Sequence, residues 1–229
     1  MTKSLTVDYE TTTPDLKMRM PLLCLSVLTL PATAIAEVEL SFYGGIQSAI
    51  GSDVTVSGDT VIPDETNAVD WEGKSFAAPP YYGIRATVWA SDEFGYGLDF
   101  AHNKIYPKTL PAGYDTLEFT DGLNTLTVNA YRRWDNAIGD FTPYVGGGLG
   151  LSIPHVEVTN GASETFGYQV TGPAATWIAG ASYPINDKWS VFGEYKGTYT
   201  QNTAELDTGG TLETDVVTNA VNIGLSFRF

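Results

Sequence analysis

The sequence predicts an all-β protein, an eight-stranded antiparallel up-and-down transmembrane β-barrel. Three observations support this prediction. Apolar and polar residues alternate with a period of two in eight segments, each about ten residues long, the length of a tilted strand that crosses a bilayer. The connections between these segments alternate between short and long. A sequence typical of an export signal precedes the first segment.

The first 36 residues are predicted to be an N-terminal extension followed by a cleaved signal peptide, which leaves residues 37–229 as the barrel domain. Lys17 and Arg19 precede a short apolar run at residues 21–30, and small residues form a cleavage site that ends at Ala36. The run is too short to cross a bilayer as a helix. Residues 1–17 are acidic and rich in Thr, unlike the start of a signal peptide, so three start codons stay open: Met1, Met18 and Met20.

The composition argues against several classes of protein. The chain has 27 acidic and 12 basic residues and a net charge of −15. This argues against nucleic acid as a partner, because binding phosphates requires a basic patch. The single cysteine, Cys24, lies within the predicted signal peptide, so a disulfide scaffold and a Cys-based zinc site are excluded.

Each of the first four segments places its apolar residues on one face, which we expect to contact lipid. The segments are residues 37–50, 81–91, 95–104 and 123–134. Their outward positions are, in order, Val38, Leu40, Phe42 and Ile46; Tyr82, Ile84, Ala86 and Val88; Tyr96, Leu98 and Phe100; and Leu126, Val128, Ala130 and Trp134.

The last four segments are residues 142–153, 173–183, 188–200 and 221–229. The final segment has the clearest alternation, and the face of residues 173–183 that points outward is the least clear. Their outward positions are, in order, Val145, Leu149, Leu151 and Ile153; Trp177, Ala179, Ala181 and Tyr183; Trp189, Val191, Tyr195 and Tyr199; and Val221, Ile223, Leu225, Phe227 and Phe229.

The connections predict which end of the barrel faces the periplasm. Residues 91–94, 135–141 and 184–187 are short connections, whereas residues 51–80, 106–122, 154–172 and 201–214 are long and rich in Gly, Thr, Asp and Pro. Short turns on the periplasmic side and long outer loops are typical of a transmembrane barrel. An even number of strands then leaves both termini on the periplasmic side.

The opposite face of each segment would line an interior that is just wide enough for side chains. It carries Arg85, Asp99, Arg133, Glu194 and Lys196. Because buried charges are costly unless they are paired, we expect an internal network of ion pairs. The glycine run at residues 146–148 would leave room for large interior side chains. The alternative is a soluble barrel or sandwich with an apolar core. Aromatic residues near the segment ends suit interfacial belts: Tyr82, Tyr96, Trp134, Trp177, Tyr183, Trp189, Phe227 and Phe229.

Residues near the predicted outer rim form the candidate catalytic set. His102 and His155 continue the outward face of two strands, and Asn124 has the same position on the strand between them. Strand spacing places the two histidines roughly 10 Å apart, facing lipid. Outward histidines could act as a general base on a sugar hydroxyl or hold a metal ion. The alternative is that they only hydrogen-bond phosphate or water. The set is completed by three carboxylates that are close in sequence: Glu118, Asp121 and Glu157.

The first long connection contains many carboxylates, which have two interpretations. A divalent cation prefers oxygen ligands, so this loop could hold one, although the spacing of a Ca²⁺-binding loop is absent. The alternative is a solvated acidic loop. The carboxylates are Asp53, Asp59, Asp64, Glu65, Asp70 and Glu72.

Six stretches carry a resemblance to a known family: ELSFYG at 39–44, APPYYG at 78–83, LEFTDGLN at 117–124, PHVE at 154–157, VFGEYKGTY at 191–199 and ETD at 213–215. They resemble the alphaproteobacterial outer-membrane barrels known as lipid A oxidases, over nearly all of residues 37–229. The terminal Phe229 also resembles the signal by which such barrels meet the outer-membrane assembly machinery. The candidate catalytic set above rests on geometry and is not taken from that family.

The resemblance implies a location in the outer membrane of a Gram-negative bacterium and lipopolysaccharide as a partner. It implies oxygen-dependent oxidation of the proximal glucosamine of lipid A to 2-aminogluconate, with molecular oxygen as co-substrate. The identity of any metal stays open. The alternative is a non-enzymatic small barrel with a structural or lipopolysaccharide-binding role. A pore is a third possibility, which the filled interior of an eight-stranded barrel disfavours.

Overall fold

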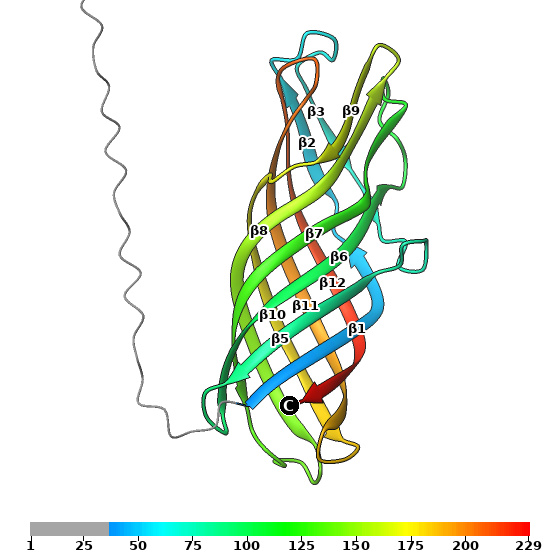
Figure 1. The fold of residues 1–229 in the computed structure, drawn as a ribbon. Helices are drawn as coiled ribbons and strands as arrows, with labels where there is room; N and C mark the ends of the chain where they lie inside the picture. Colours follow the sequence, from blue (N-terminus) through cyan, green and yellow to red (C-terminus); the bar gives the residue numbers. More distant parts are fainter. Residues whose placement is uncertain (1–36) are drawn as a thin grey trace, which may run out of the picture. The chain divides into compact units, whose positions relative to one another are not determined.

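The computed structural model describes residues 37–229, which form an elongated antiparallel barrel (Figure 1). The predicted signal peptide lies outside the described residues. The wall follows the order β1-β5-β6-β7-β8-β10-β11-β12, and β12 pairs with β1 to close the ring. The predicted class, an eight-stranded up-and-down barrel, is therefore confirmed. The wall strands are β1 (Glu37–Ala49), β5 (Tyr82–Trp89), β6 (Phe94–Pro107), β7 (Thr116–Arg133), β8 (Thr142–Asn160), β10 (Gly172–Pro184), β11 (Trp189–Glu205) and β12 (Thr211–Arg228).

Four of the wall strands extend much further at their outer ends than the alternation predicts. β7 begins at Thr116 rather than Leu123, β8 continues to Asn160, β11 continues to Glu205, and β12 begins at Thr211. Four additional strands occupy the predicted long connections: β2 (Ser52–Ser57), β3 (Glu65–Val69), β4 (Trp71–Glu72) and β9 (Ser163–Tyr168). Much of what the sequence predicts as outer loops is therefore sheet, and the short connections 90–93, 134–141 and 185–188 are at the opposite end.

The middle and inner parts of the wall have the predicted polarity. Outward apolar side chains are exposed, for example Leu149 at 72% and Val221 at 69%. The inward set is polar and buried, including Arg85, Asp99 and Glu194. An apolar surface turned away from a polar interior fits a wall that is surrounded by hydrocarbon.

Polarity reverses at the outer end of the barrel, which explains why the predicted strands end too early. On β12 the inward Leu212 and Val216 are buried, whereas the outward Glu213 and Asp215 are exposed. The alternation continues, but the apolar residues now point inward, as in a protein surrounded by water. A search for apolar outward positions therefore stops where the strand leaves the membrane. The outer core contains Val54, Val56, Ile62, Val69, Trp71, Ile105, Tyr114, Leu117, Phe119, Leu123, Val156, Val158, Ala204, Leu206, Leu212 and Val216.

Among residues 37–229, no helix has the length and hydropathy required to cross a membrane.

Candidate functional site

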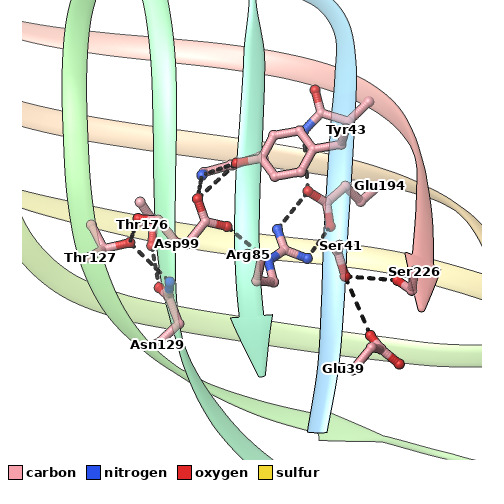
Figure 2. A network of polar contacts seen from close by, with 12 residues as sticks. Glu39, Ser41, Tyr43, Arg85, Asp99, Thr127, Asn129, Thr176, Glu194 and Ser226 are labelled. Atoms are coloured by element: carbon pink, nitrogen blue, oxygen red, sulfur yellow. Dashed lines mark hydrogen bonds and ion pairs between the residues drawn. The ribbon is translucent and has the colours of Figure 1, made fainter. Parts of the chain in front are cut away.

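The predicted network of ion pairs is formed by buried side chains in the lumen (Figure 2). The Arg85 guanidinium donates from Nε to Asp99 Oδ2 at 2.8 Å and from Nη1 and Nη2 to the two oxygens of Glu194 at 2.9 Å each. Lys196 Nζ donates to Asp99 Oδ1 at 2.6 Å and to the Tyr43 hydroxyl at 2.7 Å. Two cations and two carboxylates therefore compensate one another away from water.

Large interior side chains rest over inward glycines. A Cβ at Gly83 would collide with the ring of Tyr43, and one at Gly146 would collide with the ring of Tyr131. Gly148 leaves space for the Asn129 amide in the same way. The prediction that the glycine run leaves room for large neighbours is confirmed at Gly146 and Gly148.

Below the network, toward the short turns, the lumen contains a cavity of about 200 Å³. Trp89 and Tyr131 line it, and the indole N–H and the phenol hydroxyl have no hydrogen-bond partner among the described residues. The predicted interior residue Arg133 also lines the cavity, lies 4.0 Å from the centre of the Trp89 ring and donates to Glu37 at 3.0 Å. This cavity is at the opposite end of the barrel from the predicted rim residues.

At the outer rim, the structure brings His102 and Asn124 together. They are direct partners in the β6–β7 ladder, and His102 Nδ1 lies 2.8 Å from Asn124 Oδ1. Tyr82 stacks on the other side of the imidazole at 5.2 Å between ring centres. The expectation that His102 is exposed to lipid is wrong, because its exposure is 4%. Its Nε2 has no hydrogen-bond partner among the described side chains and backbone.

His155 is also buried, contrary to expectation, and it is not part of the same row. Asn124 pairs with Ile153 on β8, so His155 lies two residues further along that strand. The rings of Phe166 and Tyr168 on β9 contact the His155 imidazole edge-on, at 4.4 and 4.8 Å between centres. β9 occupies a segment that the sequence predicts as a loop. The sequence therefore does not predict that β9 side chains bury His155.

The carboxylates of the candidate set lie beyond the lipid-facing band. Glu118 and Glu157 face each other as direct partners in the β7–β8 ladder, and both are half-buried. Burial raises the pKa of the Glu118 carboxyl, and the Glu157 carboxylate raises it further, whereas Lys74 and Lys104 oppose the shift. Asp121 acts on Glu118 in the same direction as Glu157. The structure therefore places Glu118 and Glu157 side by side, with Asp121 near enough to act on the Glu118 pKa.

Sequence reasoning missed two lysines and a tyrosine at this rim. Lys104 is buried and its Nζ donates to the carbonyl of Ala78 at 3.0 Å. Lys74 Nζ lies 4.0 Å from the centre of the Tyr106 ring. Burial raises the pKa of the Tyr106 phenol, and the carboxylates of Glu118, Asp121 and Glu157 raise it further. A signal was available, because Lys104 and Tyr106 continue the outward alternation of Phe100 and His102.

Within residues 37–229, no group of three or more His, Asp or Glu side chains is arranged to hold a metal ion. In the acidic first connection, two carboxylates bind backbone instead. Asp59 Oδ1 accepts from the N–H groups of Val61 and Ile62, at 2.7 and 2.8 Å, and Asp64 accepts from the N–H of Gly58 at 2.7 Å. These carboxylates hold the turn between β2 and β3.

The family-model comparison agrees with this architecture. Residues 20–229 match the family model described as outer membrane protein beta-barrel domain. Similar solved structures include Neisserial surface protein A, with 14% identity, a TM-score of 0.47 and coverage of 85% of this chain and 97% of that one. The attachment invasion locus protein Ail of Yersinia pestis has 13% identity, a TM-score of 0.41 and coverage of 85% and 99%. OprG of Pseudomonas aeruginosa has 12% identity, a TM-score of 0.46 and coverage of 85% and 95%. No curated protein matches the sequence.

Proposed function

Because the chain belongs to the family of outer membrane protein β-barrel domains, we propose that it works on lipopolysaccharide in the outer leaflet of a Gram-negative outer membrane. The specific activity we propose is oxidation of the proximal glucosamine of lipid A to 2-aminogluconate, with molecular oxygen as the oxidant. The sequence resemblance supports this choice of reaction. The geometry of the rim supports the choice of site.

One observation carries the proposal. His102 and Asn124 form a pair on the outward side of the wall, directly above the lipid-facing band, and the group of carboxylates lies nearby. An outward site at this boundary is where the sugars of lipid A meet a barrel wall. A histidine is suited to accept a proton from a sugar hydroxyl, and so is a carboxylate whose pKa is raised.

The proposed reaction balances as a two-electron oxidation. A reducing-end glucosamine with a free anomeric hydroxyl loses the hydrogen on its anomeric carbon and the hydroxyl proton. Molecular oxygen takes up both electrons and both protons and becomes hydrogen peroxide. The resulting lactone adds water and opens to 2-aminogluconate. In this scheme His102 or Glu118 would accept the hydroxyl proton, and Asn124 would orient the imidazole.

A second candidate function is favoured by the burial of both histidines. His102 lies beside the backbone of Pro79, in the connection that precedes β5, and His155 lies behind Phe166 and Tyr168. Neither imidazole reaches a substrate unless these covers move. A barrel that binds lipopolysaccharide at the same rim without converting it requires no such movement.

Mass spectrometry of lipid A separates the two candidates. Cells that express the protein are compared with cells that lack it and with cells that express His102→Ala or, as a matched control at an exposed outer carboxylate, Glu213→Gln. Oxidation predicts lipid A that is heavier by one oxygen atom in the wild type and Glu213→Gln, and a loss of this product in His102→Ala. Unchanged lipid A from cells that contain the folded barrel would refute the oxidase proposal. Lipopolysaccharide that still co-purifies with such a barrel would support the second candidate.

A further inference from the structure

The connection between β4 and β5, residues 73–81, lies against the outside of the barrel wall; we call it the rim loop. In Figure 1 it stands out sideways from the wall near β6, well below the outer tips of the barrel. Its backbone is fixed by specific contacts. The buried Ser75 hydroxyl accepts a hydrogen bond from the N–H of Gln47 at 2.9 Å. The carbonyl oxygen of Ala78 accepts one from the Lys104 ammonium at 3.0 Å.

The outer surface of the rim loop is apolar. Phe76 is 80% exposed, and Ala78, Pro79 and Pro80 are exposed as well. No charged residue lies between Lys74 and Arg85. A contiguous, exposed apolar segment on a fixed backbone differs from the single apolar side chains that are scattered over most protein surfaces.

This apolar surface continues into the lipid-facing band. Tyr82, directly after the loop, stacks on Phe42 of β1 and contacts Phe100 of β6, each at 6.2 Å between ring centres. Phe42 is among the outward side chains that face hydrocarbon. At the base of the loop, the half-exposed Lys74 ammonium lies over the Tyr106 ring and pairs with the Glu72 carboxylate at 3.3 Å. An apolar tip with a half-exposed ion pair at its base fits the boundary between acyl chains and headgroups, because the tip avoids water and the charges remain in the polar region.

We propose that the rim loop is inserted into the outer leaflet, with Phe76 and the Pro79–Pro80 pair among the upper acyl chains and Lys74 at the level of the headgroups. The partner is the lipid surface itself. The inference goes beyond the proposed function and does not depend on any chemistry at His102. It adds a lateral lipid contact to a wall whose other lipid contacts come from strands.

Site-directed fluorescence tests this insertion. Cys24 is the single cysteine of the chain, so a Cys24→Ser background accepts one engineered cysteine without interference. Phe76→Cys carries an environment-sensitive label, and the barrel is refolded into phospholipid vesicles that contain lipids with a nitroxide high on the acyl chain. Two matched controls are Val221→Cys, in the lipid-facing band, and Thr66→Cys, an exposed position of β3 in the outer part.

The label at Phe76→Cys is expected to be quenched by the lipid nitroxide, as at Val221→Cys, and to be protected from aqueous iodide. The label at Thr66→Cys should show the opposite pattern. A rim-loop label that behaves like Thr66→Cys would overturn the proposal, and so would self-quenching that shows a second copy of the chain on this surface. Ala78→Cys provides a second reporter if the first variant does not refold.

Discussion

At the scale of single residues, Arg85 is the cation that compensates most of the buried negative charge in the lumen. Its guanidinium serves both Asp99 and Glu194, and its side chain is almost fully buried. Removing one member of such a group leaves a charge in a medium that solvates it poorly, which costs more than the ion pair contributes when intact.

Arg85→Met is therefore expected to lower the free energy of unfolding by about 3–5 kcal/mol. Urea titration of the barrel in vesicles measures this loss. Because Lys196 still compensates Asp99 at 2.6 Å, the double variant Arg85→Met/Glu194→Met should regain most of the stability. The exposed pair of Arg132 and Glu93 provides a control, since Arg132→Gln should change stability by less than about 1 kcal/mol. An equal loss in the single and double variants would contradict the network as the cause.

The Glu118 carboxyl should make the stability of the barrel depend on pH. Its pKa is raised in the folded state from an ordinary value of 4.5. The folded protein therefore holds the Glu118 proton more tightly than the unfolded chain does. This contribution to stability is complete below pH 4.5 and is lost as the pH rises through the folded pKa.

Glu118→Gln is accordingly expected to stabilise the barrel at pH 8 and to have little effect at pH 4, as measured by the urea midpoint at each pH. The same change at the exposed Glu213 should have a small effect at both pH values. A stabilisation by Glu118→Gln that is equal at the two pH values would show that ionisation of this half-buried carboxyl beside Glu157 is not the reason.

At the scale of elements, the close packing of aromatic rings against wall strands decides which glycines can be replaced by a larger residue. Gly83 faces the lumen, where a Cβ would collide with the ring of Tyr43. A Cβ at Gly193 would find its nearest neighbour, the Asn222 carbonyl oxygen, at 3.8 Å. Both lie in wall strands, and Gly193 is the exposed, outward comparison at which a methyl group has room.

Gly83→Ala is expected to destabilise the barrel by about 1–3 kcal/mol, because it displaces Tyr43 from Asp99 and Lys196. Gly193→Ala should be tolerated. The temperature at which the folded barrel loses its compact gel mobility measures both effects. Equal thermal stability of the two variants would show that Tyr43 moves aside without cost.

Much of the wall could be predicted from the sequence, because a strand in a membrane must alternate and Val221, Ile223 and Leu225 do so clearly. The interior position of Arg85 and Glu194 follows from the same rule. Their contact joins β5 to β11, and no local pattern encodes such a pairing. The burial of His102 and His155 escaped prediction for a similar reason, since their covers come from the rim loop and from β9. The surroundings of the two residues depend on tertiary structure.

At the scale of the whole molecule, two different fillings close the lumen. The ion pairs around Arg85 occupy the part within the membrane, and the apolar outer core around Trp71 and Leu117 fills the part beyond it. We expect no stepwise ion conductance from the purified protein in a planar bilayer. Arg85→Ala should also show no conductance steps, because the apolar outer core still closes the lumen beyond the membrane. Well-resolved conductance steps from the wild type would contradict a closed lumen.

The reversal of polarity along each long strand has a consequence for how the protein sits in its bilayer. Sinking by one pair of residues would carry Glu213 toward hydrocarbon, and rising by the same amount would lift Leu225 and its neighbours toward the aqueous phase. Both displacements are opposed, so the immersion depth is fixed by the chain itself. In a bilayer of another thickness, the surrounding lipids would have to stretch or compress to meet the protein.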